Sequence, residues 1–346
     1  MKLYHYAILF AIIALTLFVI ADVKTDNFGA ISDEKKILDQ SFHRAVDDAV
    51  LHLVESDGIE GLKVNKERSV EDFFLSLYAA MGITNNPEKQ ELIKNYIPVI
   101  TITSEDGYYM YYSDEYKGSD NYTYYSKRWS EKLPYYYEDD DFIYGFTLTD
   151  TLTIYDKNGI LDNSREQIIF TLDYHDLKSD EKYSNFRSKR SNSFLLNDES
   201  YYLVRKESII TCIEDSLAYY CDQHNYIAQQ FGITYNFAMP VVDKSEWTQS
   251  IDTPSMIVIF QGYPFRNGVD GTYNRFVIAG SGIKKKEMYL LEQKEWYYLY
   301  HKDNCSELKK DNSIILSETY DEVIDCVNEG AYACPLCISS GVYAPE

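Results

Sequence analysis

An uninterrupted apolar segment near the N terminus most constrains what this chain can fold into. Between Tyr6 and Val23 the only polar side chains are those of Thr16 and Asp22. As a helix rising about 1.5 Å per residue, this run is long enough to cross a bilayer core of roughly 30 Å. We therefore predict a transmembrane anchor over residues 1–23. A cleaved signal peptide is the alternative, because the end of the run contains small residues that fit a cleavage site.

The charge of the chain limits the classes of partner that it can bind but does not fix the orientation of the apolar run in the membrane. The chain has 55 acidic and 33 basic residues, for a net charge of -22. An acidic surface repels phosphate backbones, so we expect no nucleic-acid partner. Basic residues flank the apolar run on both sides, so the positive-inside rule does not fix its orientation. Because a large domain behind one N-terminal span is typically exported, we expect a single-pass protein of the cell membrane with an extracytoplasmic C-terminal domain.

Helical periodicity follows the anchor. Apolar residues recur every three or four positions from Leu38 to Leu53, which is one face of a helix. This helix either continues the transmembrane helix or docks separately on the following domain. A second helix is predicted within residues 65–82, with a capping box at Ser69 and Asp72 and an end at Gly82. A third is predicted over 87–96, so residues 24–96 form a helical stalk.

From residue 97 the pattern changes to that of strands, and the chain is rich in tyrosine, with 34 copies. Tyrosine suits half-buried strands because its ring packs while its hydroxyl stays hydrated. Glu105-Asp106-Gly107 indicates a hairpin, and Gly232 ends a long helix that begins near residue 198. Other strands are predicted at 147–155, 168–174, 233–240, 255–264 and 275–282, with a turn at 157–159 and a loop at 178–200.

The order of these elements predicts an α+β fold. Its parts are the anchor (residues 1–23), the helical stalk (24–96), a tyrosine-rich α+β ectodomain (97–295) and a small Cys/His tail (296–346).

The tail contains a possible metal site. His301 and Cys305 form H-x3-C, and Cys334 and Cys337 form C-x2-C, with 28 residues between the two pairs. One imidazole and three thiolates are a ligand set typical of structural zinc, and four protein ligands leave no open position for catalysis. Two alternatives remain open, namely a disulfide such as Cys305–Cys334 and a thioredoxin-like redox pair.

The other three cysteines have simpler interpretations. Cys212 and Cys221 are nine residues apart on the predicted long helix, so they face opposite sides and are expected to be buried thiols that cannot bond each other. Cys326 is expected to be a small core residue of a helix over 319–328, with Thr319 and Glu322 as its capping box.

Several stretches carry a family resemblance: "AVDDAV", "FFLSLYAAMGI", "YIPVITITSEDGYYMYYSDEY" and "KRWSEKLPYYYEDDDFIYGFTL". With the anchor, they resemble uncharacterised single-pass membrane proteins of Gram-positive anaerobes, associated with clusters for tight-adherence or type IV-like pili and with conjugative elements. The tail resembles a "YH-x3-C … GY-x2-C-x2-C" ending of some secreted nucleases and competence-type membrane proteins. Ala331, between Gly330 and Tyr332, departs from that pattern.

These resemblances imply a binding or assembly protein rather than an enzyme. We expect an accessory of a pilus-like or conjugation apparatus whose partners are other envelope or pilus-assembly proteins, with structural zinc in its tail. The competing class is a cell-surface enzyme, either a hydrolase or a C-x2-C thiol oxidoreductase. His175, His224 and Asp222 are the residues from which a hydrolase triad would be assembled, and their spacing in the sequence gives no geometry for one.

Overall fold

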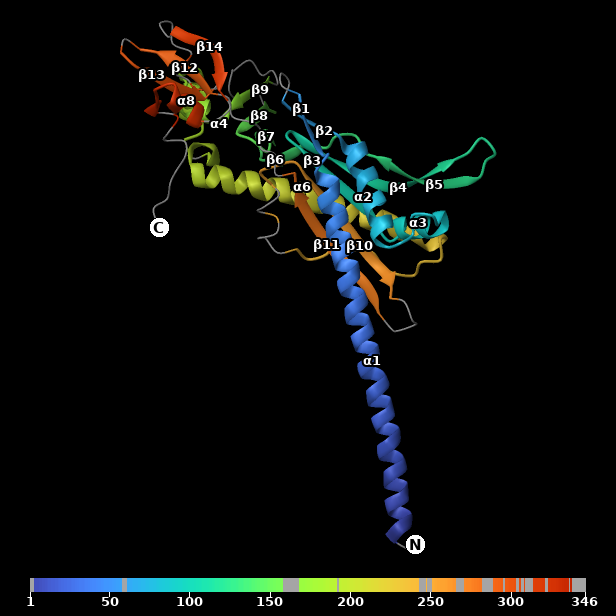
Figure 1. Ribbon diagram of the computed structural model, residues 1–346. Helices are drawn as coiled ribbons and strands as arrows, with labels where there is room; N and C mark the ends of the chain where they lie inside the picture. Colours follow the sequence, from blue (N-terminus) through green and yellow to red (C-terminus); the bar gives the residue numbers. More distant parts are fainter. Residues whose placement is uncertain are drawn as a thin grey trace. The chain divides into compact units, whose positions relative to one another are not determined.

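The computed structural model in Figure 1 confirms an α+β protein. The chain divides into two compact units, one formed by Met1–Tyr174 with Ser184–Gly282 and the other by His175–Tyr183 with Ile283–Glu346. The structure describes residues 3–57, 61–157, 168–191, 193–242, 247, 251–265, 271–281, 289–294, 296–302, 305, 308, 314–320, 323–335 and 337.

A single helix, α1 (Leu3–Val50), contains both the predicted anchor and the first predicted stalk helix (Figure 1). Its side chains change environment along its length. Leu15 and Phe18 are largely exposed, whereas Phe42 and Val46 are fully buried. Of the two arrangements that the sequence left open, the continuous helix is therefore the one formed. Among the residues that the structure describes, no helix combines the length and the apolar character needed to cross a membrane.

The first unit is built on a five-stranded antiparallel sheet in the order β11-β10-β3-β4-β5. The predicted hairpin is confirmed, because Ser104 pairs with Gly107 around Glu105 and Asp106. Every residue of β3 is buried, as expected for a strand covered on both faces. The strands are β3 (Val99–Ser104), β4 (Gly107–Lys117), β5 (Thr123–Trp129), β10 (Ser255–Pro264) and β11 (Thr272–Gly280).

Helices cover the two faces of this sheet. On one face, the Phe42 ring of α1 lies 6.0 Å from Phe73 of α2 (Lys66–Ala80) and 5.4 Å from Phe260 of β10. On the other face lies α6 (Asp198–Gln230), the predicted long helix. There the Tyr108 hydroxyl of β4 donates to the Cys212 carbonyl at 2.7 Å. Buried side chains thus pack in two layers, one on each face of this sheet.

The observed helix ends agree with the sequence-based predictions only in part. The prediction of a capping box at Ser69 is wrong. Asn65 caps α2, its side chain accepting from the Arg68 amide, while the Ser69 hydroxyl donates to the Ala49 carbonyl at 2.9 Å. The structure confirms the stop at Gly82, whose φ of 67° is open to glycine. The third predicted helix is α3 (Pro87–Lys94), and β1 (Val54–Asp57) and β2 (Gly61–Val64) form a hairpin before α2.

A second antiparallel sheet, β6-β7-β8-β9, completes the first unit. The strand predicted at 147–155 begins later, at Thr151, because the Thr147 hydroxyl accepts from the Thr149 amide and donates to the Thr151 carbonyl. The strand predicted at 168–174 is confirmed as β9, and the predicted turn at 157–159 lies mostly outside the described residues. The strands are β6 (Tyr135–Glu138), β7 (Phe142–Phe146), β8 (Thr151–Asp156) and β9 (Ile168–Asp173).

Two segments differ from the sequence prediction. The loop predicted at 178–200 contains short helices, because Phe186 and Leu195 are buried and fix the backbone around them. The strand predicted at 233–240 does not form, since the Asn225 side chain holds both the amide and the carbonyl of Phe237. The short helices are α4 (Tyr174–Ser179), η1 (Glu181–Tyr183), α5 (Ser184–Lys189) and η2 (Phe194–Leu196).

The second unit has a four-stranded sheet in the order β14-β12-β13-β15, in which β13 and β15 are parallel. Its small core includes Cys326, as predicted, with Tyr289, Leu291 and Ala331. The predicted helix start at Thr319 is wrong, because Thr319 pairs with β12 as part of a strand. The elements are β12 (Tyr289–Gln293), β13 (Tyr298–Lys302), β14 (Ile314–Tyr320), α8 (Val323–Asn328) and β15 (Ala331–Ala333).

Candidate metal centre

Strand pairing brings the two halves of the Cys/His motif together. His301 lies near the end of β13, and Cys305 follows that strand. The parallel pairing of β15 with β13 places Ala333 opposite Tyr300, and the Cys334 amide donates to the Tyr300 carbonyl at 3.0 Å. Segments separated by about thirty residues therefore meet side by side, which short-range spacing alone does not dictate.

All four predicted ligands converge on one point. Their ligand atoms lie within 4.8 Å of one another. The His301 Nδ1 atom is 3.4 Å from the Cys305 sulfur, which is 4.0 Å from the Cys334 sulfur. A tetrahedral zinc with Zn–S bonds of about 2.3 Å separates two sulfurs by about 3.8 Å. The separations fit such a site, so the four side chains have the identity and placement to hold a metal ion.

Burial distinguishes the cluster from an exposed pair of thiols. His301, Cys305 and Cys334 are buried, and Cys337 is half-buried. The Cys337 amide donates to the Cys334 carbonyl at 3.0 Å, which forms the tight turn that directs both sulfurs of the C-x2-C pair to one side. The Cys305 and Cys334 sulfurs stand about twice a disulfide bond length apart, so they are neighbours without being bonded.

A buried glutamate behind His301 was missed by the sequence reasoning. Glu292 of β12 is 2 % exposed, and its Oε2 lies 2.9 Å from His301 Nε2. Lys294 donates to the other carboxylate oxygen at 2.6 Å. A carboxylate on Nε2 assigns the proton to that nitrogen and leaves the Nδ1 lone pair facing the cysteines, which is a common arrangement behind metal-binding histidines. The one available signal was an acid within the apolar strand "YLLEQ".

The two cysteines of α6 do not belong to this cluster. Cys221 of α6 is buried, as predicted. Cys212 is only partly buried, and its thiol donates to the Tyr136 carbonyl at 3.4 Å. All six cysteines belong to the described residues, and none forms a disulfide with another.

His224, one of the two histidines considered for a hydrolase, is buried in the core of the first unit. His224 is 1 % exposed, and its Nε2 atom lies 2.8 Å from the Asn95 carbonyl oxygen, to which it donates. Burial, together with the positive charge of Lys127, lowers the pKa of His224 to about 3. Asp222, two residues earlier on α6, is exposed. A base with so low a pKa is poorly matched to proton abstraction near neutral pH.

Comparison with protein-family models, curated proteins and solved structures found no match to this chain.

Proposed function

We propose that this protein is a membrane-tethered, extracytoplasmic binding protein whose C-terminal unit is stabilised by a structural zinc ion. The observation that carries the proposal is the convergence of His301, Cys305, Cys334 and Cys337 in front of a buried glutamate. The proposed partners are other envelope or pilus-assembly proteins, in line with the family resemblance described above.

The ligand chemistry favours zinc over other metals. Three thiolates and one imidazole are soft or intermediate ligands, which suit zinc and disfavour calcium and magnesium. With four protein ligands the coordination shell is closed, so the ion would crosslink β13, the segment after it and the C-x2-C turn. The hydrophobic core of this unit is small, and units of this size commonly depend on a metal for stability.

The exposed apolar half of α1 supports the tether. Phe10, Leu15 and Phe18 each have more than two thirds of their surface exposed. Apolar surface of this extent is unfavourable in water and calls for a lipid or protein environment. The full apolar run from Tyr6 to Val23 has the length of a single membrane crossing. The same helix ends inside the core of the first unit, so it would join that unit directly to the membrane.

A closed metal site and a histidine of low pKa favour a binding role over a catalytic one.

Pull-down of the full-length protein from envelope extracts, with and without coexpression of its genomic neighbours, tests the proposed partners. Recovery of envelope or pilus-assembly proteins is expected, and recovery of none would count against the binding role.

Elemental analysis tests the metal. We expect about one zinc per chain in the purified full-length protein, and we expect Cys334→Ser to lose the zinc together with thermal stability. Cys326→Ala is the matched control, because it also removes a buried thiol from this unit but leaves the four ligands intact. A zinc-free native protein, or a Cys334→Ser variant that folds normally and loses only thiol–disulfide exchange, would instead favour the oxidoreductase alternative.

A further inference from the structure

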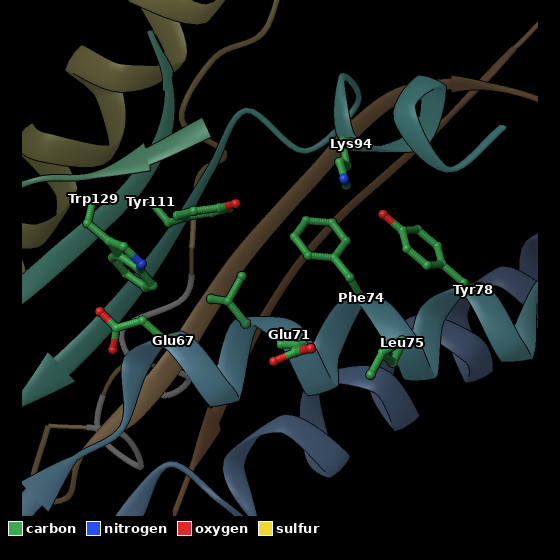
Figure 2. Close-up of a pocket in the computed structure, with 9 residues that line it drawn as sticks. Glu67, Glu71, Phe74, Leu75, Tyr78, Lys94, Tyr111 and Trp129 are labelled. Carbon is green, nitrogen blue, oxygen red and sulfur yellow. The ribbon is translucent and has the colours of Figure 1, made fainter. Parts of the chain in front are cut away.

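A groove in the first unit runs along one side of α2. Figure 2 shows its lining, which comes from α2, from Lys94 of α3, from Tyr111 of β4 and from Trp129 of β5. Its volume is about 300 Å³, room for a long side chain and at the lower end of the range for ligand pockets. All of its lining residues belong to the first unit, and neither the proposed metal nor the proposed tether uses it.

Aromatic rings form two walls of the groove. Tyr111 and Trp129 pair directly across β4 and β5, so both rings project from the same face of the sheet, with centroids 4.9 Å apart. On α2, Phe74 and Tyr78 are one helical turn apart and stack with centroids 5.8 Å apart. The face of an aromatic ring carries negative electrostatic potential and attracts cations.

The chain's own lysines already lie on rings of this region. The Lys66 Nζ atom is 4.9 Å from the Trp129 ring centre, and Lys94 Nζ is 5.9 Å from that of Phe74. Each of these lysines also has a carboxylate partner on its own helix, Glu67 for Lys66 and Glu91 for Lys94. The aromatic walls therefore already tolerate ammonium groups, and the charge of each resident ammonium group is balanced by a carboxylate.

One carboxylate and one hydroxyl of the groove remain without partners. Glu71 lies on the groove side of α2 and forms no ion pair or hydrogen bond within the described part of the chain. The buried Tyr78 hydroxyl likewise lacks a hydrogen-bond partner there, and Figure 2 shows it directed to the side where Lys94 lies. Glu71 is exposed, so water hydrates its carboxylate in the free protein, whereas the Tyr78 hydroxyl is buried. A ligand that brings a positive charge and hydrogen-bond donors would pair with Glu71 and satisfy the Tyr78 hydroxyl.

We propose that this groove binds a lysine or arginine side chain presented by a basic segment of a partner protein. The cation would enter between the two aromatic walls, with its charge facing Glu71. The net charge of -22 would attract such a segment over a distance, and the groove would supply the specific contact. This inference names a partner class for the proposed binding role and rests on it.

Calorimetric titration of the full-length protein in neutral detergent with capped penta-lysine, at physiological salt, tests the proposal. We expect binding by the wild type, and an affinity at least about fivefold lower for Glu71→Lys, because an attractive charge becomes a repulsive one. Asp222→Lys is the matched control, with the same charge change at an exposed position on α6, and should bind within about twofold of the wild type. A second variant, Trp129→Leu, should weaken binding about threefold by removing the ring face.

Other outcomes would overturn the proposal. Equal losses from Glu71→Lys and Asp222→Lys would mean that the peptide binds the acidic surface diffusely. Equal binding of penta-(Nε-acetyl-lysine) would exclude a role for the ammonium charge. Binding of an N-acetylglucosamine oligomer that survives Glu71→Lys, with no binding of penta-lysine, would assign the rings to a sugar instead. None of these results would alter zinc content or recovery of envelope partners, so failure here is distinguishable from failure of the proposed function.

Discussion

His301 Nε2 lies 2.9 Å from a carboxylate oxygen of Glu292, while its Nδ1 faces the sulfur of Cys305 at 3.4 Å. The two contacts give the two nitrogens of the imidazole ring different roles. Glu292 fixes the ring orientation and its proton, and the other nitrogen is left to bind a metal.

Removing the carboxylate should therefore weaken metal binding without removing a ligand. We expect Glu292→Leu to lower zinc affinity about 10- to 100-fold, and Glu292→Gln to lower it less because an amide oxygen still accepts from Nε2. Competition with a chromogenic chelator measures the affinity. Glu329→Gln, an exposed acid of the same unit, is the control. Unchanged affinity in Glu292→Leu would contradict the orienting role.

Metal removal should loosen the second unit. The proposed ion ties β13 to the segment after β15, so a chelator such as EDTA should raise deuterium uptake in peptides from β12, β13 and β15 several-fold. Mass spectrometry of exchanged peptides gives the readout, and added zinc should restore protection. Protection that is the same before and after complete metal removal would show that the unit does not depend on the ion.

The contact of α1 with the sheet should carry much of the first unit's stability. Phe42 is fully buried between Phe73 and Phe260, so Phe42→Ala should lower the free energy of unfolding by about 3–5 kcal/mol. Ile37→Ala, at a site 60 % exposed on the same helix, should change it by less than about 0.5 kcal/mol. Urea denaturation compares the two, and similar small losses from both would place Phe42 outside the stabilising core.

Acid should destabilise the first unit partly through His224. Its pKa is 6.5 in the unfolded reference and about 3 when folded, so the unfolded chain binds a proton that the folded chain does not. This contribution to stability is complete above pH 6.5 and is lost as pH falls toward 3, at about 1.4 kcal/mol per pH unit. Relative to His224→Gln, the wild type should lose stability more steeply between pH 6 and about pH 4. Parallel pH profiles from urea titrations would contradict this assignment.

Charges in the exposed apolar half of α1 should release the protein from membranes. Each aspartate near the middle of a spanning helix costs about 2.5–3.5 kcal/mol of insertion free energy, so Leu15→Asp combined with Phe18→Asp should shift the protein to the soluble fraction. Ile37→Asp, exposed on the same helix but outside the apolar run, should stay in the membrane pellet. Carbonate extraction followed by immunoblotting makes the comparison, and equal partitioning of both variants would argue against the tether.

Local chemistry made much of the fold predictable. Gly82 and Gly232 mark helix ends because both adopt positive φ, and the hairpin at Glu105-Asp106 follows from turn residues between two apolar runs. One error, the strand predicted at 233–240, arose where a side chain acts on a distant segment of the backbone. Asn225 fixes the backbone of Phe237 in place of a strand ladder, and apolar alternation gives no sign of such a bond.

The candidate site was predictable in its ligands but not in its support. Cysteine and histidine spacing indicated four metal ligands, because that chemistry depends on residue type and short-range separation. The role of Glu292 depends on strand register: Leu290 pairs with His301 and Glu292 with Leu299, which puts the glutamate diagonally beside the histidine. The sequence does not specify that register, since the loop between the strands gives no distinctive turn signal.

The unbroken course of α1 has a mechanical consequence. Between Val23, at the end of the apolar run, and Leu38, which is buried, the chain is helical throughout and would form a stiff spacer of about 22 Å. Such a spacer also transmits rotation, since each residue turns the helix by about 100°. Inserting one residue there would rotate the folded unit around the helix axis by about 100°. Inserting seven residues would add almost two full turns, so the unit would keep nearly the same orientation and would only lie farther from the apolar run.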